Sequence, residues 1–200
     1  MQYTYNEFKT ITGPNLELSE LRASDYSDLY NSLVDAETWF SKARNLNSQT
    51  AFENHLNGLL SRRKNGDALT LVARKIKSRE VVATSTYFSS VYENFAKVEI
   101  GFTWVASSYH GSSVNTELKL LMLDYAFEKI KTARVEFFVH PTNGKSNSAV
   151  KKIGAKFEGL LRKSRFRSNN DDGHRNIYSI VDNEWPSVRE NLILRLKRLS

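Results

Sequence analysis

Residues 97–117 read KVEIGFTWVASSYHGSSVNTE, and this stretch decides the fold. Over 97–105, apolar residues alternate with polar or small ones, which is the period of a β-strand. The side chains that this alternation assigns to one face are Val98, Ile100, Phe102 and Trp104. From Val114 to Lys131 most positions are apolar, and the polar exceptions fall on one narrow stripe at helical spacing. A strand therefore leads through a short connection into a long helix, which should lie across a sheet.

The flanking segments predict the remaining strands and helices. Alternating polarity or an excess of β-formers predicts strands over 16–21, 69–73, 81–88, 134–139, 156–161 and 175–181. Apolar residues at helical spacing predict helices over 26–33, 49–63, 145–153 and 185–199, the first capped by Ser24 or Asp25. The polar segment KIKSRE over 75–80 is typical of an antiparallel hairpin, so the sheet is not purely parallel. The order of elements predicts an α+β fold with a central mixed sheet covered by helices.

Length and composition limit the class of protein. With 200 residues, of which 40% are hydrophobic, the chain is expected to form a single domain over 1–200. Cysteine is absent, which excludes disulfides, thiolate metal sites and cysteine nucleophiles. The four histidines show no metal-ligand spacing, so we expect no metal site. The sequence shows no signal-like N-terminus and no apolar stretch of bilayer length, and we expect a cytoplasmic protein without a membrane partner.

A net charge of +7, from 29 Lys and Arg against 22 Asp and Glu, favours anionic partners. These include nucleic acid, ribosomes, acidic proteins and phosphate-rich cofactors. A solvated cationic face on an ordinary enzyme gives the same charge, so net charge alone does not choose among them. The basic run RKSRFR over 162–167 leaves the same choice open, since it fits RNA, an acidic peptide, cofactor phosphates or simply the basic face of an exposed strand.

The connection over 106–117, ASSYHGSSVNTE, suits an anion. It contains one glycine, several small polar residues and no acidic residue before Glu117. A helix N-terminus carries unpaired N–H groups and positive dipole character, and small residues let a phosphate approach those groups. The other interpretation is a plain strand-to-helix loop in which a serine caps the helix.

Three segments resemble successive motifs of a known family: VEIGFTWV over 98–105, YHGSSVNTELKLLMLDYAFE over 109–128, and HPTNGKSNSAVKKIGAKFEGLLR over 140–162. Together they resemble the GCN5-related N-acetyltransferases (GNAT), and most closely the branch of Rim-type ribosomal-protein N-terminal acetyltransferases. The resemblance implies the GNAT fold, in which helices lie on both faces of a mixed, mostly antiparallel sheet and two parallel strands splay apart. Here the splayed strands would be 97–105 and 134–139. The resemblance also implies acetyl-CoA as the acetyl donor.

The resemblance further implies a set of cofactor-binding residues. The pantetheine arm would lie between the splayed strands and the pyrophosphate on the loop before the long helix. The family's loop pattern falls on Ser108, Gly111 and Ser113, and only the glycine matches it. The implied contacts are Trp104, Val105, His110, Gly111, Ser112, Ser113, Val114, Asn115, Thr116, Asn143 and Ser146. Two of these contacts have structural alternatives, because the Trp104 side chain suits a core and Asn143 before a glycine suits a turn.

Acetyl transfer to an amine also needs a proton for the departing thiolate. Ser146 matches the serine that the family places near the cofactor sulfur as proton donor, and its alternative role is to cap the following helix. The carboxylate that Rim-type enzymes use falls on Arg165 by spacing, and Glu99 is the nearest substitute as a catalytic group. Glu158 is expected to make a structural contact. The implied acceptor-binding residues are Trp39, Phe40, Glu99 and Arg165.

The sequence therefore predicts an acetyl-CoA-dependent N-acetyltransferase that acts on a primary amine, either a protein N-terminus or a small molecule. Direct transfer is expected, because the chain has neither a cysteine nor a Ser/His/Asp arrangement to form a covalent intermediate. A homodimer is compatible with the resemblance. The alternative function is a non-catalytic module of the same fold whose basic surface binds nucleic acid or a protein partner.

Overall fold

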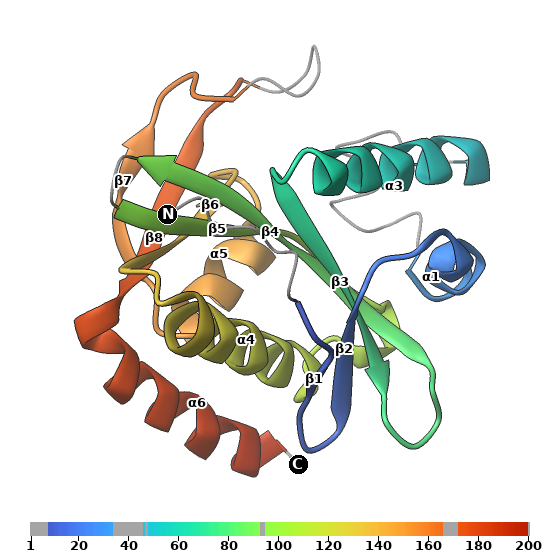
Figure 1. Ribbon diagram of the computed structural model, residues 1–200. Helices are drawn as coiled ribbons and strands as arrows, with labels where there is room; N and C mark the ends of the chain where they lie inside the picture. The colour runs from blue at the N-terminus through green and yellow to red at the C-terminus, as the bar shows by residue number, and fades with distance from the viewer. Residues whose placement is uncertain (1–7, 34–45, 47, 93–94, 166–171, 200) are drawn as a thin grey trace.

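A computed structural model describes residues 8–33, 46, 48–92, 95–165 and 172–199 (Figure 1). Its described strands form one eight-stranded sheet in the order β1-β2-β3-β4-β5-β6-β8-β7. The strands are β1 (Ile11–Thr12), β2 (Leu16–Glu20), β3 (Ala68–Lys75), β4 (Val81–Tyr92), β5 (Phe95–Val105), β6 (Arg134–Val139), β7 (Lys156–Leu161) and β8 (Arg175–Val181). Among these strands only β5 and β6 pair parallel. The predicted mixed, mostly antiparallel sheet is confirmed.

Helices cover both faces of this sheet (Figure 1). On one face lie α1 (Tyr26–Leu33) and α3 (Gln49–Lys64), and on the other lie α4 (Val114–Asp124), α5 (Gly144–Lys152) and α6 (Trp185–Leu199). The shorter helical segments are η2 (Ala23–Asp25), η3 (Ser107–Tyr109), η4 (Tyr125–Ile130) and η5 (Asp182–Glu184). The two caps predicted for α1 lie inside η2, where the Asp25 carboxylate accepts a hydrogen bond from the Arg22 N–H at 2.7 Å.

The two helical layers enclose two separate hydrophobic cores. The larger core packs α4, α5 and α6 against the sheet, and Leu118, Met122 and Val135 are each fully buried in it. The smaller core packs α1 and α3 against the other face around Leu29 and Phe52. A side chain that leaves the sheet on one face therefore meets different helices from one that leaves it on the other.

Strand β5 contains an irregularity that its alternating sequence did not predict. Its register against β4 shifts so that Phe102 and Thr103 together lie opposite Ser85, and Phe102 has a left-handed φ of 48°. This is a β-bulge, which reverses the faces of the residues beyond it. The prediction that the four apolar side chains share one face is therefore wrong. The larger core takes Val98 and Ile100, whereas the smaller core takes Trp104 with Phe102 packed against it.

The long helix also differs from its predicted form. It is α-helical from Val114 to Asp124, continues as the π-helical turn η4, and ends at Lys131 with a φ of 58°. The first member of its polar stripe is buried, since Glu117 is only 1% exposed. The Glu117 carboxylate accepts hydrogen bonds from the backbone N–H groups of Asn15 and Leu16 at 2.7 and 2.8 Å. This buried carboxylate fixes the β1–β2 turn to helix α4.

Candidate active site

The parallel strands β5 and β6 separate after a short paired region. They pair at three positions, and the last pair joins Glu99 to Glu136. Beyond Glu99, the edge of β5 that faces β6 has no strand partner within the described ranges. An open strand edge presents backbone N–H and C=O groups to an extended, amide-containing ligand, which can pair with it as another strand would.

The connection from β5 to α4 ends beside this open edge. Its glycine, Gly111, has a φ of +83°, and a Cβ added there would meet nothing within 4 Å. Ser113, which stands where the family pattern has a second glycine, has an ordinary φ of −70°, so a serine fits there without strain. The backbone N–H groups of Asn115 and Thr116 have no acceptor in the described part of the chain. Such groups at a helix start suit a phosphate.

Three other predicted cofactor contacts have structural roles at or near this loop. The His110 ring lies with Nε2 3.1 Å from the Val105 carbonyl oxygen, so it ties the loop to the end of β5. The Trp104 side chain is 4% exposed and packs edge-on against Phe52 at a centroid distance of 5.4 Å. The Trp104 side chain therefore belongs to the smaller core. The Ser112 hydroxyl accepts a hydrogen bond from the Val114 N–H at 3.2 Å, which caps the first turn of α4.

The start of α5 separates the two roles that the sequence left open for Ser146. The helix is capped by Asn143, whose Oδ1 accepts a hydrogen bond from the Ser146 N–H at 3.1 Å. The capping alternative for Ser146 is therefore wrong. The half-buried Ser146 hydroxyl has no hydrogen-bonding partner among the described residues. It is available to a ligand at the N-terminus of the helix.

Asn147, which the sequence reasoning missed, holds this helix start in place. Its amide donates to the carbonyl oxygens of His140, at 3.0 Å, and Asn143, at 2.8 Å. Its Oδ1 accepts from Asn176 at 2.9 Å and from the Tyr178 hydroxyl at 2.8 Å. The β6–α5 connection is thereby fixed to β8. No pattern near Asn147 indicates this role, because its partners on β8 lie 29 and 31 residues away.

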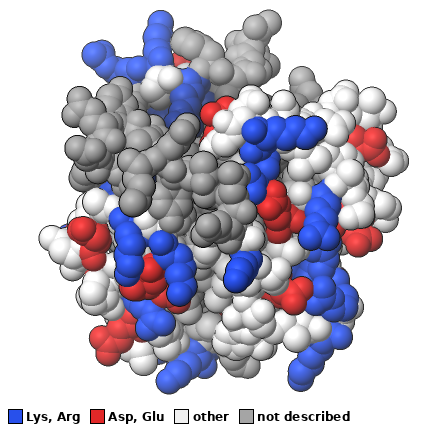
Figure 2. Space-filling model, in the orientation of Figure 1, with Lys and Arg blue, Asp and Glu red and all other residues white. Residues whose placement is uncertain are grey.

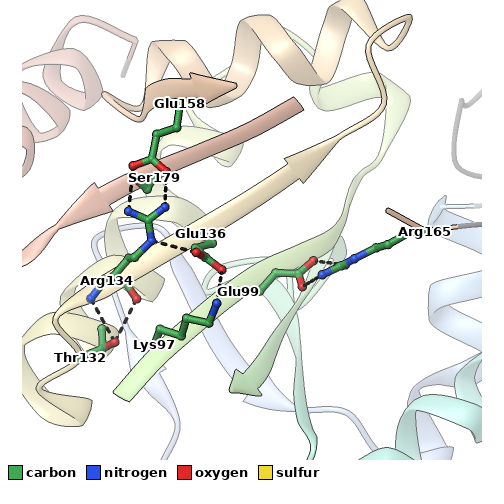
Figure 3. Close-up of polar contacts among 8 residues, drawn as sticks. All are labelled: Lys97, Glu99, Thr132, Arg134, Glu136, Glu158, Arg165 and Ser179. Atoms are coloured by element: carbon green, nitrogen blue, oxygen red, sulfur yellow. Dashed lines mark hydrogen bonds and ion pairs between the residues drawn. The ribbon is translucent and has the colours of Figure 1, made fainter. Parts of the chain in front are cut away.

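Glu99 and Arg165, predicted separately as acceptor-site residues, form one pair (Figure 3). The guanidinium donates to both carboxylate oxygens at 2.9 and 2.8 Å. It also lies over the Phe138 ring, 4.2 Å from the ring centroid. The Glu99 side chain is 13% exposed and that of Arg165 39%. The guanidinium uses one acceptor site on each Glu99 oxygen, so a ligand there would meet a neutral ion pair rather than a bare carboxylate.

Comparison with known proteins identifies the family of this chain. A family model described as "Acetyltransferase (GNAT) domain" matches residues 15–156. The chain belongs to the GNAT acetyltransferases. A related sequence, the probable N-acetyltransferase YjcK of Bacillus subtilis (strain 168), is 30% identical over 84 residues. That match covers 42% of this chain and 46% of YjcK, so it spans about half the length of that relative.

Solved structures share the GNAT fold of this chain. The crystal structure of an acetyltransferase candidate is 28% identical with a TM-score of 0.82, and the match covers 94% of this chain and 93% of that one. Mycobacterium smegmatis RimJ in complex with CoA-disulfide is 22% identical with a TM-score of 0.73, and the match covers 94% of each chain. Rim-type enzymes are thus among the structural neighbours, as the sequence resemblance indicated.

In this GNAT chain a series of ion pairs crosses the sheet face opposite α4 (Figure 3). The Arg134 guanidinium donates to Glu136 at 2.8 Å and binds Glu158 through two hydrogen bonds. Glu136 also pairs with Lys97 at 3.2 Å, and Glu158 accepts from the Ser179 hydroxyl at 2.6 Å. The structural contact predicted for Glu158 is therefore confirmed. This series joins β5, β6, β7 and β8 beside the Glu99–Arg165 pair.

The ion pair at Glu158 predicts a loss of stability in acid. Hydrogen bonds from Arg134 hold the pKa of the Glu158 carboxyl at about 2, below its ordinary 4.5. The stabilisation is therefore complete above pH 4.5 and is lost as the pH falls toward 2. Because the side chain is 39% exposed, we expect Glu158→Gln to lower the free energy of unfolding by only about 1 kcal/mol at pH 7. Urea denaturation from pH 7 to pH 2 should show the difference from the unmodified protein vanishing.

Replacement of the exposed Glu190 provides the control for this measurement. Glu190→Gln should change the free energy of unfolding at pH 7 by less than Glu158→Gln does. If the Glu158→Gln difference persisted at pH 2, the ion pair would not be its cause.

Several sequence predictions concern residues outside this geometry. Trp39 and Phe40, predicted to bind the acceptor, lie outside the described residues, as does the end of the basic run at 166–167. Its described part follows β7 as a turn rather than extending the strand. Figure 2 shows Lys and Arg side chains lying next to Asp and Glu over the face in view, without one continuous basic surface there.

The described ranges contain no group of three or more acidic or histidine side chains that could hold a metal ion. Of the helices they contain, none combines the length and the apolar character needed to cross a bilayer.

Proposed function

We propose that this GNAT chain is an acetyl-CoA-dependent N-acetyltransferase that transfers acetyl directly to a primary amine. The observation that carries the proposal is that β5, whose edge beyond Glu99 is open, leads into a helix start where the N–H groups of Asn115 and Thr116 are unpaired. A ligand with phosphates at one end and amides along an arm matches both features. The RimJ neighbour, crystallised with CoA-disulfide, supports this choice of ligand.

The proposed binding groups belong to three elements. The start of α4 would hold the pyrophosphate through backbone N–H groups, with Gly111 leaving space for its approach. The β5 edge beyond Glu99 would pair with the pantetheine amides. When bound, acetyl-CoA supplies an activated acetyl group as a thioester. The residues present therefore suit a cofactor with phosphates at one end and amides along its arm.

The proposed chemistry assigns one proton transfer to the chain. Ser146 Oγ would donate the proton that the leaving thiolate needs, and it lies at the N-terminus of α5, where the helix dipole favours developing negative charge. The Glu99–Arg165 pair would contact the acceptor. The proton that the amine loses on acetylation would pass to solvent, from which Ser146 would regain the proton that it gives to the thiolate. The proposed acceptor is a primary amine on a protein N-terminus or a small molecule.

Cofactor binding predicts thermal stabilisation by CoA. A ligand that binds only the folded state stabilises it by about 2.7 kcal/mol at a hundredfold excess over Kd. For a chain of 200 residues this corresponds to a rise in Tm of about 5 to 10 °C. Calorimetry with CoA should show this rise, and pantetheine, which lacks phosphates, should show a smaller one. An unchanged Tm at millimolar CoA would remove the cofactor from the proposal.

The alternative, a non-catalytic binding module, is favoured by one observation: an arginine stands where Rim-type enzymes have a carboxylate, and it occupies Glu99. Incubation with acetyl-CoA and a panel of amines, followed by measurement of free CoA thiol, separates the two functions. Acceptor-dependent release of CoA supports the enzyme. CoA binding without release on any acceptor supports the module.

A further inference from the structure

Lys119 is a buried amine with no role in the proposed reaction. It lies in the second turn of α4 and is 4% exposed. Its Nζ donates to Thr103 Oγ1 at 2.5 Å and to Ser85 Oγ at 3.0 Å. These hydroxyls come from β5 and β4, so one amine connects the helix to two neighbouring strands.

The contacts of Lys119 converge on the β5 bulge. Thr103 is one of the two bulged residues, and Ser85 is the residue opposite them. The other bulged residue, Phe102, has a left-handed φ of 48°, a conformation that is strained outside glycine and persists only where surrounding contacts enforce it. On its other side Phe102 packs against Phe88 at a centroid distance of 4.8 Å. Lys119 thus contacts the bulge through hydrogen bonds, whereas Phe88 contacts it through aromatic packing.

The hydrogen-bonding needs of the neighbouring hydroxyls do not explain why a lysine stands at this position. The Ser85 and Thr103 hydroxyls bond to each other at 2.8 Å, and the Ser85 hydroxyl also reaches the Gly101 carbonyl oxygen at 3.4 Å. Both hydroxyls would therefore keep partners without Lys119.

Burial makes Lys119 a cost to the fold rather than a source of stability. Burial lowers the pKa of the Lys119 amine from 10.5 to about 7, because the charged form loses its hydration. No carboxylate in the described part of the chain contacts the amine, since β4 and β5 present only hydroxyls and Glu117 of α4 is bonded to Asn15 and Leu16. The stability of the fold therefore gives no reason for an amine at this position.

The position of the bulge supplies a reason. The bulge lies beyond Glu99, on the stretch of β5 whose edge is open. Helix α4 begins at the end of the connection that follows β5, residues 106–113, which is the proposed phosphate loop. Through Lys119 the second turn of α4 is fixed to that stretch of strand. We propose that Lys119 is a positioning residue that holds the open edge of β5 in register with the phosphate loop of α4, an inference that rests on the proposed binding of CoA.

The first test compares Lys119→Met with the unmodified protein. Methionine has a similar length and volume but no donor, so we expect CoA affinity, measured by calorimetry, to fall about tenfold, the loss expected of one positioning hydrogen bond. The Tm should not fall, because a buried amine is replaced by an apolar chain. In the CoA-free protein, hydrogen exchange of the amides of residues 101–105 should quicken about tenfold as the bulge loosens.

A matched pair at Thr103 tests whether Lys119 acts through the bulge. Thr103→Val keeps the shape and removes the hydroxyl, and it should reproduce the loss of affinity seen with Lys119→Met. Thr103→Ser restores the hydroxyl and should recover most of that affinity. Combining Lys119→Met with Thr103→Val should weaken binding by clearly less than the sum of the two separate losses, because both remove the Lys119–Thr103 hydrogen bond.

The outcomes separate this inference from the proposed function. If the unmodified protein did not bind CoA, the proposed function would fail, and exchange at 101–105 would still decide whether Lys119 holds the bulge. If Lys119→Met bound CoA within about twofold of the unmodified protein, or left that exchange unchanged, the positioning role would be overturned. Independent, additive losses from the two substitutions would overturn it as well.

Discussion

Replacement of Ser146 by alanine is expected to lower kcat by about a hundredfold to ten-thousandfold, the range typical of a lost general acid. The affinity for acetyl-CoA should stay near that of the unmodified protein, since the hydroxyl is proposed to act on the leaving thiolate rather than on the phosphates. Stability should change little, because Asn143 caps α5 and Ser146 contributes only its backbone N–H to that cap. Steady-state kinetics and a thermal melt on the same preparation measure these effects.

Neighbouring substitutions make this test specific. Ser148→Ala, on the exposed side of the same helix, should leave kcat unchanged. Asn143→Ala should cost about 1 kcal/mol of stability through loss of the cap. Ser146→Thr keeps the hydroxyl and should retain part of the activity. A kcat for Ser146→Ala within twofold of the unmodified protein would leave water as the proton source.

The second large effect is expected from Gly111→Asp, which should weaken CoA binding by about a hundredfold or more. The added carboxylate would extend into the open space at Gly111, where we propose that the phosphates approach. Juxtaposed like charges cost several kcal/mol, and about 1.4 kcal/mol corresponds to a tenfold change in Kd. The carboxylate could also accept hydrogen bonds from the free N–H groups of α4 and so compete with the phosphate. Isothermal calorimetry with CoA measures the loss directly.

Gly66 offers a matched control for the backbone strain. Its φ of +79° is close to the +83° of Gly111, and both positions have open space where a Cβ would stand. Gly66→Asp should therefore cost about the same 1 to 2 kcal/mol of stability without changing CoA affinity, because Gly66 lies at the end of α3. Equal CoA affinity in both variants would mean that the Gly111 loop is only a connection.

Local patterns in the sequence determined most of the secondary structure. The bounds predicted for β6, β7, β8 and α6 are those observed, and β2 and α3 differ by one residue at one end. These elements succeed because period and propensity act over a few neighbouring residues. The three motifs at 98–105, 109–128 and 140–162, in the right order of strands and helices, also sufficed to predict the GNAT family. The connection over 106–117 was different, because its local pattern fitted both a phosphate site and a plain capped loop, and the phosphate site stays a prediction.

The sequence by itself thus determined the elements, their order and the family, whereas the tertiary structure alone decided how the polar side chains are used. Glu99 meets Arg165 across 66 positions, and Glu117 meets Asn15 across 102. Lys119 reaches strands that precede it by 16 and 34 residues, and the Phe102 bulge follows from the register between two strands. Such contacts depend on which strand lies beside which, and no local period encodes that choice. These polar residues lie on different elements, so no pattern within one element could show that they meet.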